Sequence, residues 1–226
     1  MAKKLFITGT GTDVGKTYVT GLLLKKLIDE NIHAAYFKAA MSGNERDSLG
    51  NLIPGDALQV KTMAGLSQEL KTMCPYVYEN AVSPHLASKL EGKPVRMEVV
   101  KASFEKLSQS YDYVVMEGSG GIICPIRYDN EIIHLEDIIA TLGLSSLIIA
   151  NAGLGTINQV VLTVEYMKQR NLPVKGIIFN NYHGNAMEED NIFMCEELTN
   201  IPVVARVAPS DTDLHITKST LLDLFS

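Results

Sequence analysis

The chain has 226 residues, 46% of them hydrophobic and 20% charged, a composition that can bury the core of one globular domain and excludes a disordered tail protein. Its 20 Lys and Arg residues are outnumbered by 26 Asp and Glu residues, so the formal net charge is -6 and there is no overall basic field to attract nucleic acid. No run approaches the roughly 20 apolar residues of a membrane helix, and the first residues lack a signal peptide's apolar core and cleavage site. We therefore expect one cytoplasmic domain over residues 1–226, with neither nucleic acid nor membrane as its partner.

The three cysteines, Cys74, Cys124 and Cys195, stand far apart and outside any CxxC or Cys/His ligand spacing. Their spacing predicts neither a disulfide framework nor a zinc site. We expect three reduced thiols that act as small apolar side chains.

The first elements of the chain form a strand, a glycine loop and a helix. An apolar run over residues 3–9 ends in glycine, and apolar residues then recur at helical spacing over 16–30. The apolar run 33–38 follows that helix directly, so we expect a second strand that is the parallel neighbour of the first. Further on, the same patterns predict buried strands at 113–117, 145–151, 174–180 and 202–207, and helices at 96–110, 135–142, 156–170 and 187–199.

Strands alternate with helices almost throughout the chain. This alternation predicts an α/β fold, with an open, mostly parallel sheet and helices on both faces. Ligands of such folds bind beyond the carboxyl ends of the strands. The least regular stretch, residues 41–93, is a long excursion between strands, and excursions of this kind often carry substrate.

The segment TGTGTDVGKT at residues 8–17 lies between the first strand and the first helix. Its Gly-Lys-Thr ending at a helix start is the phosphate-loop pattern, in which backbone N–H groups surround phosphates, Lys16 reaches the terminal phosphates and Thr17 offers its hydroxyl to magnesium. The usual spacing would place the first glycine at Thr10, whereas this chain has Gly9 one residue earlier. The flanking strand and helix nevertheless give the required context. They favour phosphate binding, and with it a P-loop NTPase-like fold, over a glycine-rich turn with an accidental lysine.

A magnesium-nucleotide site also needs carboxylates, because this hard cation prefers oxygen ligands. Glu117 ends an apolar strand and is followed by a Gly-Ser-Gly-Gly segment that allows backbone to approach a ligand closely. Asp56 precedes a predicted helix. A solvated strand-end acid remains the alternative for Glu117, and a plain helix N-cap remains the alternative for Asp56.

Two further side chains end predicted strands on the same edge of the sheet. Lys38 closes the second strand, where a cation could neutralise charge on a phosphoryl group, although a surface lysine is the alternative. Asn180 ends a later strand, where its amide could read an adenine, although a turn former is the alternative.

Taken together, these residues resemble those of the dethiobiotin synthetases, a family of ATP-dependent carboxylases, over nearly the whole chain. A single phosphate loop is common to many nucleotide enzymes, but an ordered set of segments is much more specific. The resemblance depends on TGTGTDVGKT at 8–17, KAAMSG at 38–43, GDA at 55–57, PY at 75–76, SPH at 83–85, EGSGG at 117–121, GTIN at 155–158 and NN at 180–181.

The resemblance implies a magnesium-ATP site and a homodimer that binds 7,8-diaminononanoate at the subunit interface, with Lys16 and Lys38 catalytic. Thr17, Asp56 and Glu117 would surround the magnesium. The implied ATP-binding residues are Asp13, Val14, Gly15, Lys16, Thr17, Asp56, Glu117, Gly118, Ser119, Gly120, Asn180, Asn181 and Pro209. The implied substrate-binding residues are Thr12, Lys38 and Ser42 at the amino end and, from a second subunit, Gly155, Thr156 and Asn158 at the carboxylate.

The family's reaction proceeds in three steps. One amine captures CO2 as a carbamate, a carbamate oxygen attacks the ATP γ-phosphate to give a carbamic-phosphoric anhydride, and the second amine closes the ring and expels phosphate. Each step gathers negative charge in one place, so Lys16, Lys38 and magnesium are the cations that stabilise it. No side-chain nucleophile is needed.

Two other functions are weighed against this one. A ParA- or MinD-like switch ATPase would carry a second lysine five residues before Lys16, where this chain has Gly11, and its membrane-bound members would carry a basic amphipathic C-terminal helix, where residues 217–225 hold a single lysine. Another ATP-dependent synthetase of the same fold, related to amidotransferases, would share the phosphate loop and Glu117. It would not obviously need Lys38 with Ser42.

Overall fold

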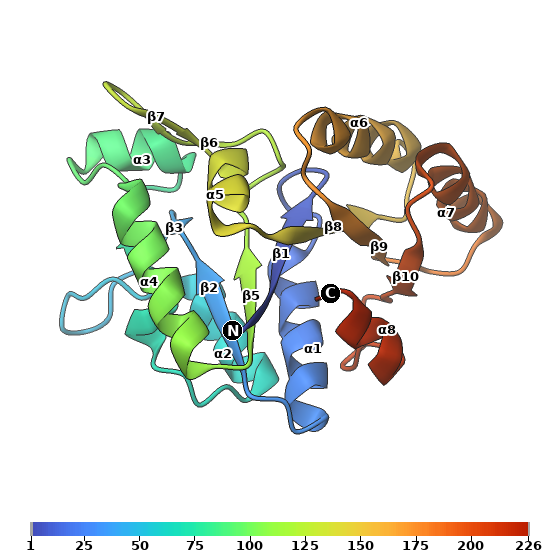
Figure 1. Cartoon of the computed structure of the whole chain (residues 1–226), viewed down its shortest axis with the longest axis horizontal. Coiled ribbons are helices and arrows are strands. Elements are labelled where there is room, and N and C mark those ends of the chain that lie inside the picture. The colour runs from blue at the N-terminus through green and yellow to red at the C-terminus, as the bar shows by residue number, and fades with distance from the viewer. Residues whose placement is uncertain (1, 226) are drawn as a thin grey trace.

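The main sheet of the protein has six strands, all parallel, in the order β10-β9-β8-β1-β5-β2. The computed structural model describes residues 2–225 (Figure 1). The strands are near-continuous buried apolar runs, as expected of a sheet covered on both faces. Their bounds are β1 Lys3–Gly9, β2 Ala34–Lys38, β5 Tyr113–Glu117, β8 Ser145–Asn151, β9 Val174–Asn180 and β10 Val203–Arg206.

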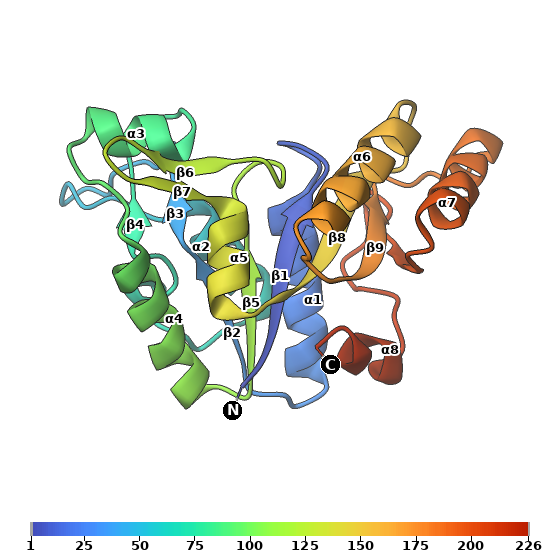
Figure 2. The ribbon, with the colours of Figure 1, turned by 45° about the horizontal axis from the view of Figure 1, so that its top comes forward.

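Helices cover both faces of this sheet and divide the hydrophobic core into two layers (Figure 2). One layer contains apolar residues of α1 Lys16–Asp29, α2 Gly55–Ala64 and α8 Lys218–Asp223. The other layer contains those of α4 Met97–Ser110, α5 Leu135–Leu142, α6 Thr156–Gln169 and α7 Ala186–Thr199. The predicted α/β class, with a parallel sheet between two helical layers, is confirmed.

One predicted neighbour relation is wrong. The second strand, β2, is parallel to β1 but does not pair with it, because β5 lies between them and pairs with both. The crossover through α1 therefore skips one position in the sheet, and β1 is flanked by β5 on one side and β8 on the other. The loop that follows β1 consequently opens at the middle of the carboxyl edge of the sheet.

The excursion after β2 holds more regular structure than its sequence indicates. It contains α2, the two-stranded parallel pair β3 and β4, a short 3-10 turn and α3. Outside the excursion, an antiparallel hairpin of β6 and β7 follows the Gly-Ser-Gly-Gly segment. These shorter elements are β3 Ala40–Met41, η1 Leu70–Thr72, β4 Tyr76–Val77, α3 Pro84–Leu90, β6 Pro125–Tyr128 and β7 Ile132–His134. No helix in the described part of the chain is long and apolar enough to span a membrane.

Candidate active site

The loop between β1 and α1 leads into a helix start that has no side-chain cap. Gly15 stands before α1 with a φ of 89°, in the left-handed region, and has no side chain to cap the first turn. A Cβ at this position would lie 2.0 Å from Asn180 Nδ2, so the close approach of this loop to the end of β9 requires glycine. Asn180 Nδ2 also donates to the Val14 carbonyl at 3.1 Å. This geometry suits an anion such as phosphate.

Lys16 lies over this loop. Its Nζ donates to the Gly11 carbonyl at 2.8 Å, so the side chain curls back across the loop. Burial lowers the pKa of Lys16, and the charge of Lys38 lowers it further. A bound anion would favour the charged form of Lys16, because its negative charge would oppose the effects of burial and of the Lys38 charge.

Beside the loop, the side chains of Thr17, Lys38, Asp56 and Glu117 form one hydrogen-bonded cluster. Thr17 Oγ1 and Lys38 Nζ each donate to Glu117 Oε1 at 2.8 Å, and Lys38 Nζ also donates to Asp56 Oδ2 at 2.6 Å. The side chains of Glu117 and Lys38 are 0% and 7% exposed. The alternatives of a solvated acid for Glu117 and a surface lysine for Lys38 are therefore wrong.

Asp56 is not a helix N-cap. Pro54 occupies that position, and the Gly55 N–H of the first turn donates to Asn44 Oδ1 at 2.9 Å. Asp56 stands one residue further into α2, where its carboxylate reaches Lys38. The excursion thus places the Asp56 carboxylate, which comes from outside the main sheet, next to the end of β2.

The charges in this cluster are strongly coupled. Burial alone would lower the pKa of Lys38, but the carboxylates of Glu117 and Asp56 outweigh burial and raise it well above its ordinary value. The Lys38 ammonium therefore places a permanent positive charge between the two carboxylates. The two carboxylates that contact Lys38, together with the Thr17 hydroxyl beside Glu117, supply the oxygen ligands that Mg²⁺ prefers.

The Gly-Ser-Gly-Gly segment after β5 packs against the phosphate loop. A Cβ at Gly118 would lie 2.7 Å from the Phe6 ring, and Gly120 has a φ of 66°. A Cβ at Gly120 would come 3.8 Å from Thr12 Oγ1, so Thr12 lies next to this segment. Ser119 Oγ donates to the Ala40 carbonyl of β3 at 2.9 Å, close to Ser42 along the chain.

The residues assigned to the adenine lie beyond the ends of β9 and β10. Asn180 Oδ1 is buried without a hydrogen-bond partner among the described residues, so it is free to accept from a ligand. Asn181 is exposed, and its Nδ2 donates to Asn151 Oδ1 at 2.7 Å. Pro209 is exposed on the loop after β10, and that loop is tied to α1 by the Tyr18 hydroxyl, which donates to the Asp211 carbonyl.

Gly155, Thr156 and Asn158 lie at the start of α6, apart from the cluster around Glu117. They follow β8, which is three positions from β2 in the sheet, roughly 14 Å at a strand spacing of about 4.8 Å. Gly155 and Asn158 are exposed, whereas Thr156 Oγ1 is buried without a hydrogen-bond partner among the described residues. Within one chain, α6 and β2 lie on opposite sides of β1 (Figure 1).

Sequence reasoning missed one member of the cluster. Tyr36 is completely buried, and its hydroxyl donates to Glu117 Oε2 at 3.0 Å. The available signal was the period of two along a strand, which puts Tyr36 on the same face as Lys38. An aromatic residue in an apolar run gave no reason to expect a polar role.

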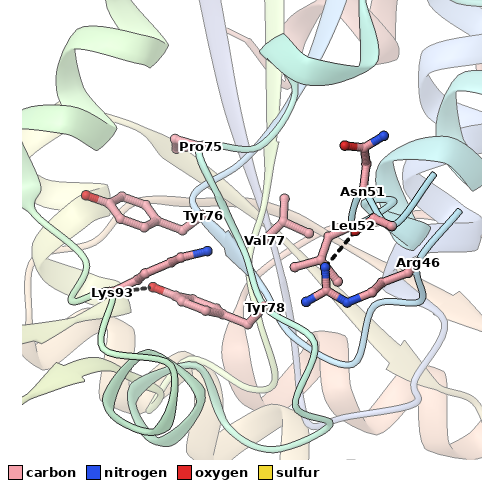
Figure 3. A pocket seen from close by; sticks show the side chains of 9 residues that line it. Arg46, Asn51, Leu52, Pro75, Tyr76, Val77, Tyr78 and Lys93 are labelled. Atoms are coloured by element: carbon pink, nitrogen blue, oxygen red, sulfur yellow. Dashed lines mark hydrogen bonds between the residues drawn. The ribbon is translucent and has the colours of Figure 1, made fainter.

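A pocket elsewhere on the excursion is separate from this cluster. It has a volume of about 410 Å³ and is lined by Arg46, Tyr76, Tyr78 and Lys93 among others (Figure 3). The guanidinium of Arg46 is held by Glu79 and by the Gly50 carbonyl. None of the residues lining this pocket belongs to the cluster around Glu117.

Comparison with known proteins shows the family of the chain. Residues 3–215 match a family model described as an AAA domain. The chain is 49% identical over 209 residues to the ATP-dependent dethiobiotin synthetase BioD of Brachyspira hyodysenteriae, with 92% of each chain covered. It is 45% identical over 227 residues to the protein of that name from Clostridium botulinum strain Loch Maree, covering 100% of this chain and 99% of the relative. Among solved structures, a ParA family ATPase from Chlorobium tepidum covers 100% of this chain and 91% of its own length, with a TM-score of 0.57 at 16% identity, a likeness that shows the fold alone.

Proposed function

The chain belongs to the ATP-dependent dethiobiotin synthetases, a family of ligases, and on that premise we propose how its residues divide the work of joining CO2 to 7,8-diaminononanoate at the expense of ATP. The observation that carries the proposal is that Thr17 and Lys38 both donate to Glu117 beside the phosphate loop, while Lys38 also binds Asp56. We also propose that the enzyme works as a homodimer in the cytoplasm.

The phosphates of ATP bind at the loop that ends in Gly15. The N–H groups of the first turn of α1 have no side-chain cap and face an anion. Lys16 stays within reach, because its ammonium rests on a carbonyl of the same loop. Asn180 contributes the free Oδ1 acceptor for the adenine amino group.

Thr17, Asp56 and Glu117 hold Mg²⁺ in this proposal. When bound, the ion neutralises phosphate charge and helps to orient the terminal phosphate. The contribution of the protein is to gather two carboxylates and a hydroxyl at one place beside the loop. The support for this assignment is that the same carboxylates already surround the Lys38 ammonium.

Lys38 is the fixed cation of the reaction. The carboxylates beside it outweigh its burial and raise its pKa, so it remains charged at any physiological pH and does not act as a base. It stabilises the negative charge that gathers as the carbamate forms and attacks the terminal phosphate. Together with Thr12 and Ser42, Lys38 orients the amino end of the substrate. The reaction is then accelerated both by the position of the substrate amines and by the charge of Lys38.

The carboxylate of the substrate binds at the start of α6 in a second subunit. Within one chain, the start of α6 lies too far from Lys38 for both to contact one small substrate closely. We therefore assign the carboxylate to Gly155, Thr156 and Asn158 of the second subunit. Two apolar side chains on this part of the chain, Leu154 and Leu162, are 89% and 61% exposed, as expected of a surface that a partner covers.

The experiment is to incubate the protein with magnesium, ATP, the diamine and ¹³C-labelled bicarbonate, and to identify the organic product by mass. We expect dethiobiotin that carries the label in its new carbonyl group, and no product when ATP is omitted. An unlabelled product, or none with all substrates present, would contradict the proposed reaction.

A further inference from the structure

The two carboxylate oxygens of Glu117 have different partners. Oε1 accepts from Thr17 and Lys38, on the side of the phosphate loop, whereas Oε2 accepts from the Tyr36 hydroxyl at 3.0 Å. Tyr36 and the Glu117 side chain are both 0% exposed. One oxygen therefore faces the site and the other faces the core.

The fold holds Tyr36 in place through its backbone as well. Tyr36 lies in β2, at the edge of the sheet, where an unpaired backbone would be exposed. The side chain of Gln68 covers this edge: Oε1 accepts from the Tyr36 N–H at 2.9 Å, and Nε2 donates to the Tyr36 carbonyl at 3.0 Å. Gln68 is itself 2% exposed, so Tyr36 has little freedom to move.

The Tyr36 hydroxyl is the hydrogen-bond donor to Glu117 Oε2, and both side chains are fully buried. A buried carboxylate oxygen without a donor is costly, because no water can take the place of the lost partner. Without the hydroxyl, Oε2 would lose this donor and the Glu117 side chain would be free to turn.

We propose that Tyr36 is a positioning residue, whose hydroxyl holds Glu117 Oε2 so that Oε1 stays directed toward Thr17 and the cation beside the phosphate loop. This inference rests on the proposed magnesium-ATP site. Tyr36, on the core face of β2, thus contributes to metal affinity as well as to packing. Donors that hold a ligating carboxylate in this way typically change metal affinity by about tenfold or more.

The test compares Tyr36→Phe with Tyr78→Phe. Both tyrosines are fully buried, and each substitution removes one hydroxyl, but the Tyr78 hydroxyl donates to the Lys93 carbonyl, away from Glu117. Binding of Mn²⁺ as a probe for Mg²⁺ is measured by electron paramagnetic resonance, with a non-hydrolysable ATP analogue and without turnover. We expect Tyr36→Phe to weaken Mn²⁺ binding about tenfold and Tyr78→Phe to leave it unchanged.

A second measurement separates positioning from a loss of folded protein. In the turnover assay, Tyr36→Phe should raise the half-saturating Mg²⁺ concentration about tenfold, while saturating Mg²⁺ restores kcat and the diamine KM is unchanged. The half-saturating concentration does not depend on how much of the sample is folded. Unchanged Mn²⁺ and Mg²⁺ dependence, or an equal effect in Tyr78→Phe, would overturn the inference. If the wild type binds Mn²⁺ with the analogue but forms no dethiobiotin, the proposed reaction fails and the role of Tyr36 is judged on metal binding alone.

Discussion

Replacement of Lys38 by methionine removes one positive charge from the centre of the cluster and keeps most of the side-chain volume. The pair with Glu117 is buried, and removing one partner of a buried ion pair costs about 3–5 kcal/mol, because the remaining charge has no counterion. The carboxylate of Asp56 is 39% exposed, so water screens it and its loss of a partner adds little. We therefore expect Lys38→Met to lower the free energy of unfolding by about 3 kcal/mol, the low end of this range.

This free energy converts to a change in melting temperature that is easy to measure. For a chain of this size, 1 kcal/mol shifts Tm by roughly 2–4 °C, so Lys38→Met should lower Tm by roughly 6–12 °C. Burial opposes the charge of Lys38, but the two carboxylates outweigh it and raise its pKa above 10.5. The stabilising contribution is therefore fully present below that value, and the wild type loses it only as the pH rises further.

The assay is thermal unfolding without nucleotide, followed by turnover of the diamine under conditions where the variant is folded. Turnover should fall about 100-fold or more, the usual cost of removing one group that stabilises transition-state charge. Lys106→Met, at an exposed lysine of α4, is the matched control and should change neither quantity. A Tm within about 2 °C of the wild type, together with near-normal turnover, would refute the reasoning about Lys38.

Four further outcomes are expected. Lys16→Met should leave the melting temperature without nucleotide unchanged or raised, because burial disfavours that charge, and should abolish the stabilisation by magnesium-ATP; a large drop without nucleotide would contradict this. Asp56→Asn should raise the half-saturating Mg²⁺ concentration for turnover, and an unchanged titration would remove Asp56 from the metal site. Asn158→Ala should raise the KM for the diamine more than that for ATP, whereas equal effects would argue against a carboxylate site on α6. Burial raises the pKa of the three thiols to about 11 or about 12, so a thiol reagent near pH 8 should react with them only after denaturation, and rapid labelling of the native protein would count against their burial.

The sequence was sufficient to predict the strands of the main sheet, because each is a buried apolar run between polar or glycine-rich segments. The predicted bounds 3–9, 113–117, 145–151 and 174–180 coincide with β1, β5, β8 and β9. The phosphate loop could also be predicted, since its glycines and lysine must stand between a strand and a helix. These features depend on neighbours along the chain.

Features that depend on distant parts of the chain could not be predicted in the same way. The order of strands was one of them, because a crossover of given handedness does not say how many positions it skips, and β5 enters the sheet between β1 and β2. The partner of Asp56 was another, since only the folded excursion brings α2 to Lys38. Tyr36 was the third, because its hydroxyl gains a role only where β2 and β5 run side by side and place it next to Glu117.

The most direct test of the proposed reaction is the release of phosphate from magnesium-ATP in the presence of bicarbonate, with and without 7,8-diaminononanoate. We expect release to depend on the diamine, with one phosphate released for each molecule of dethiobiotin formed. Phosphate release that is the same with and without the diamine would contradict it, since the phosphate loop would then serve a different reaction.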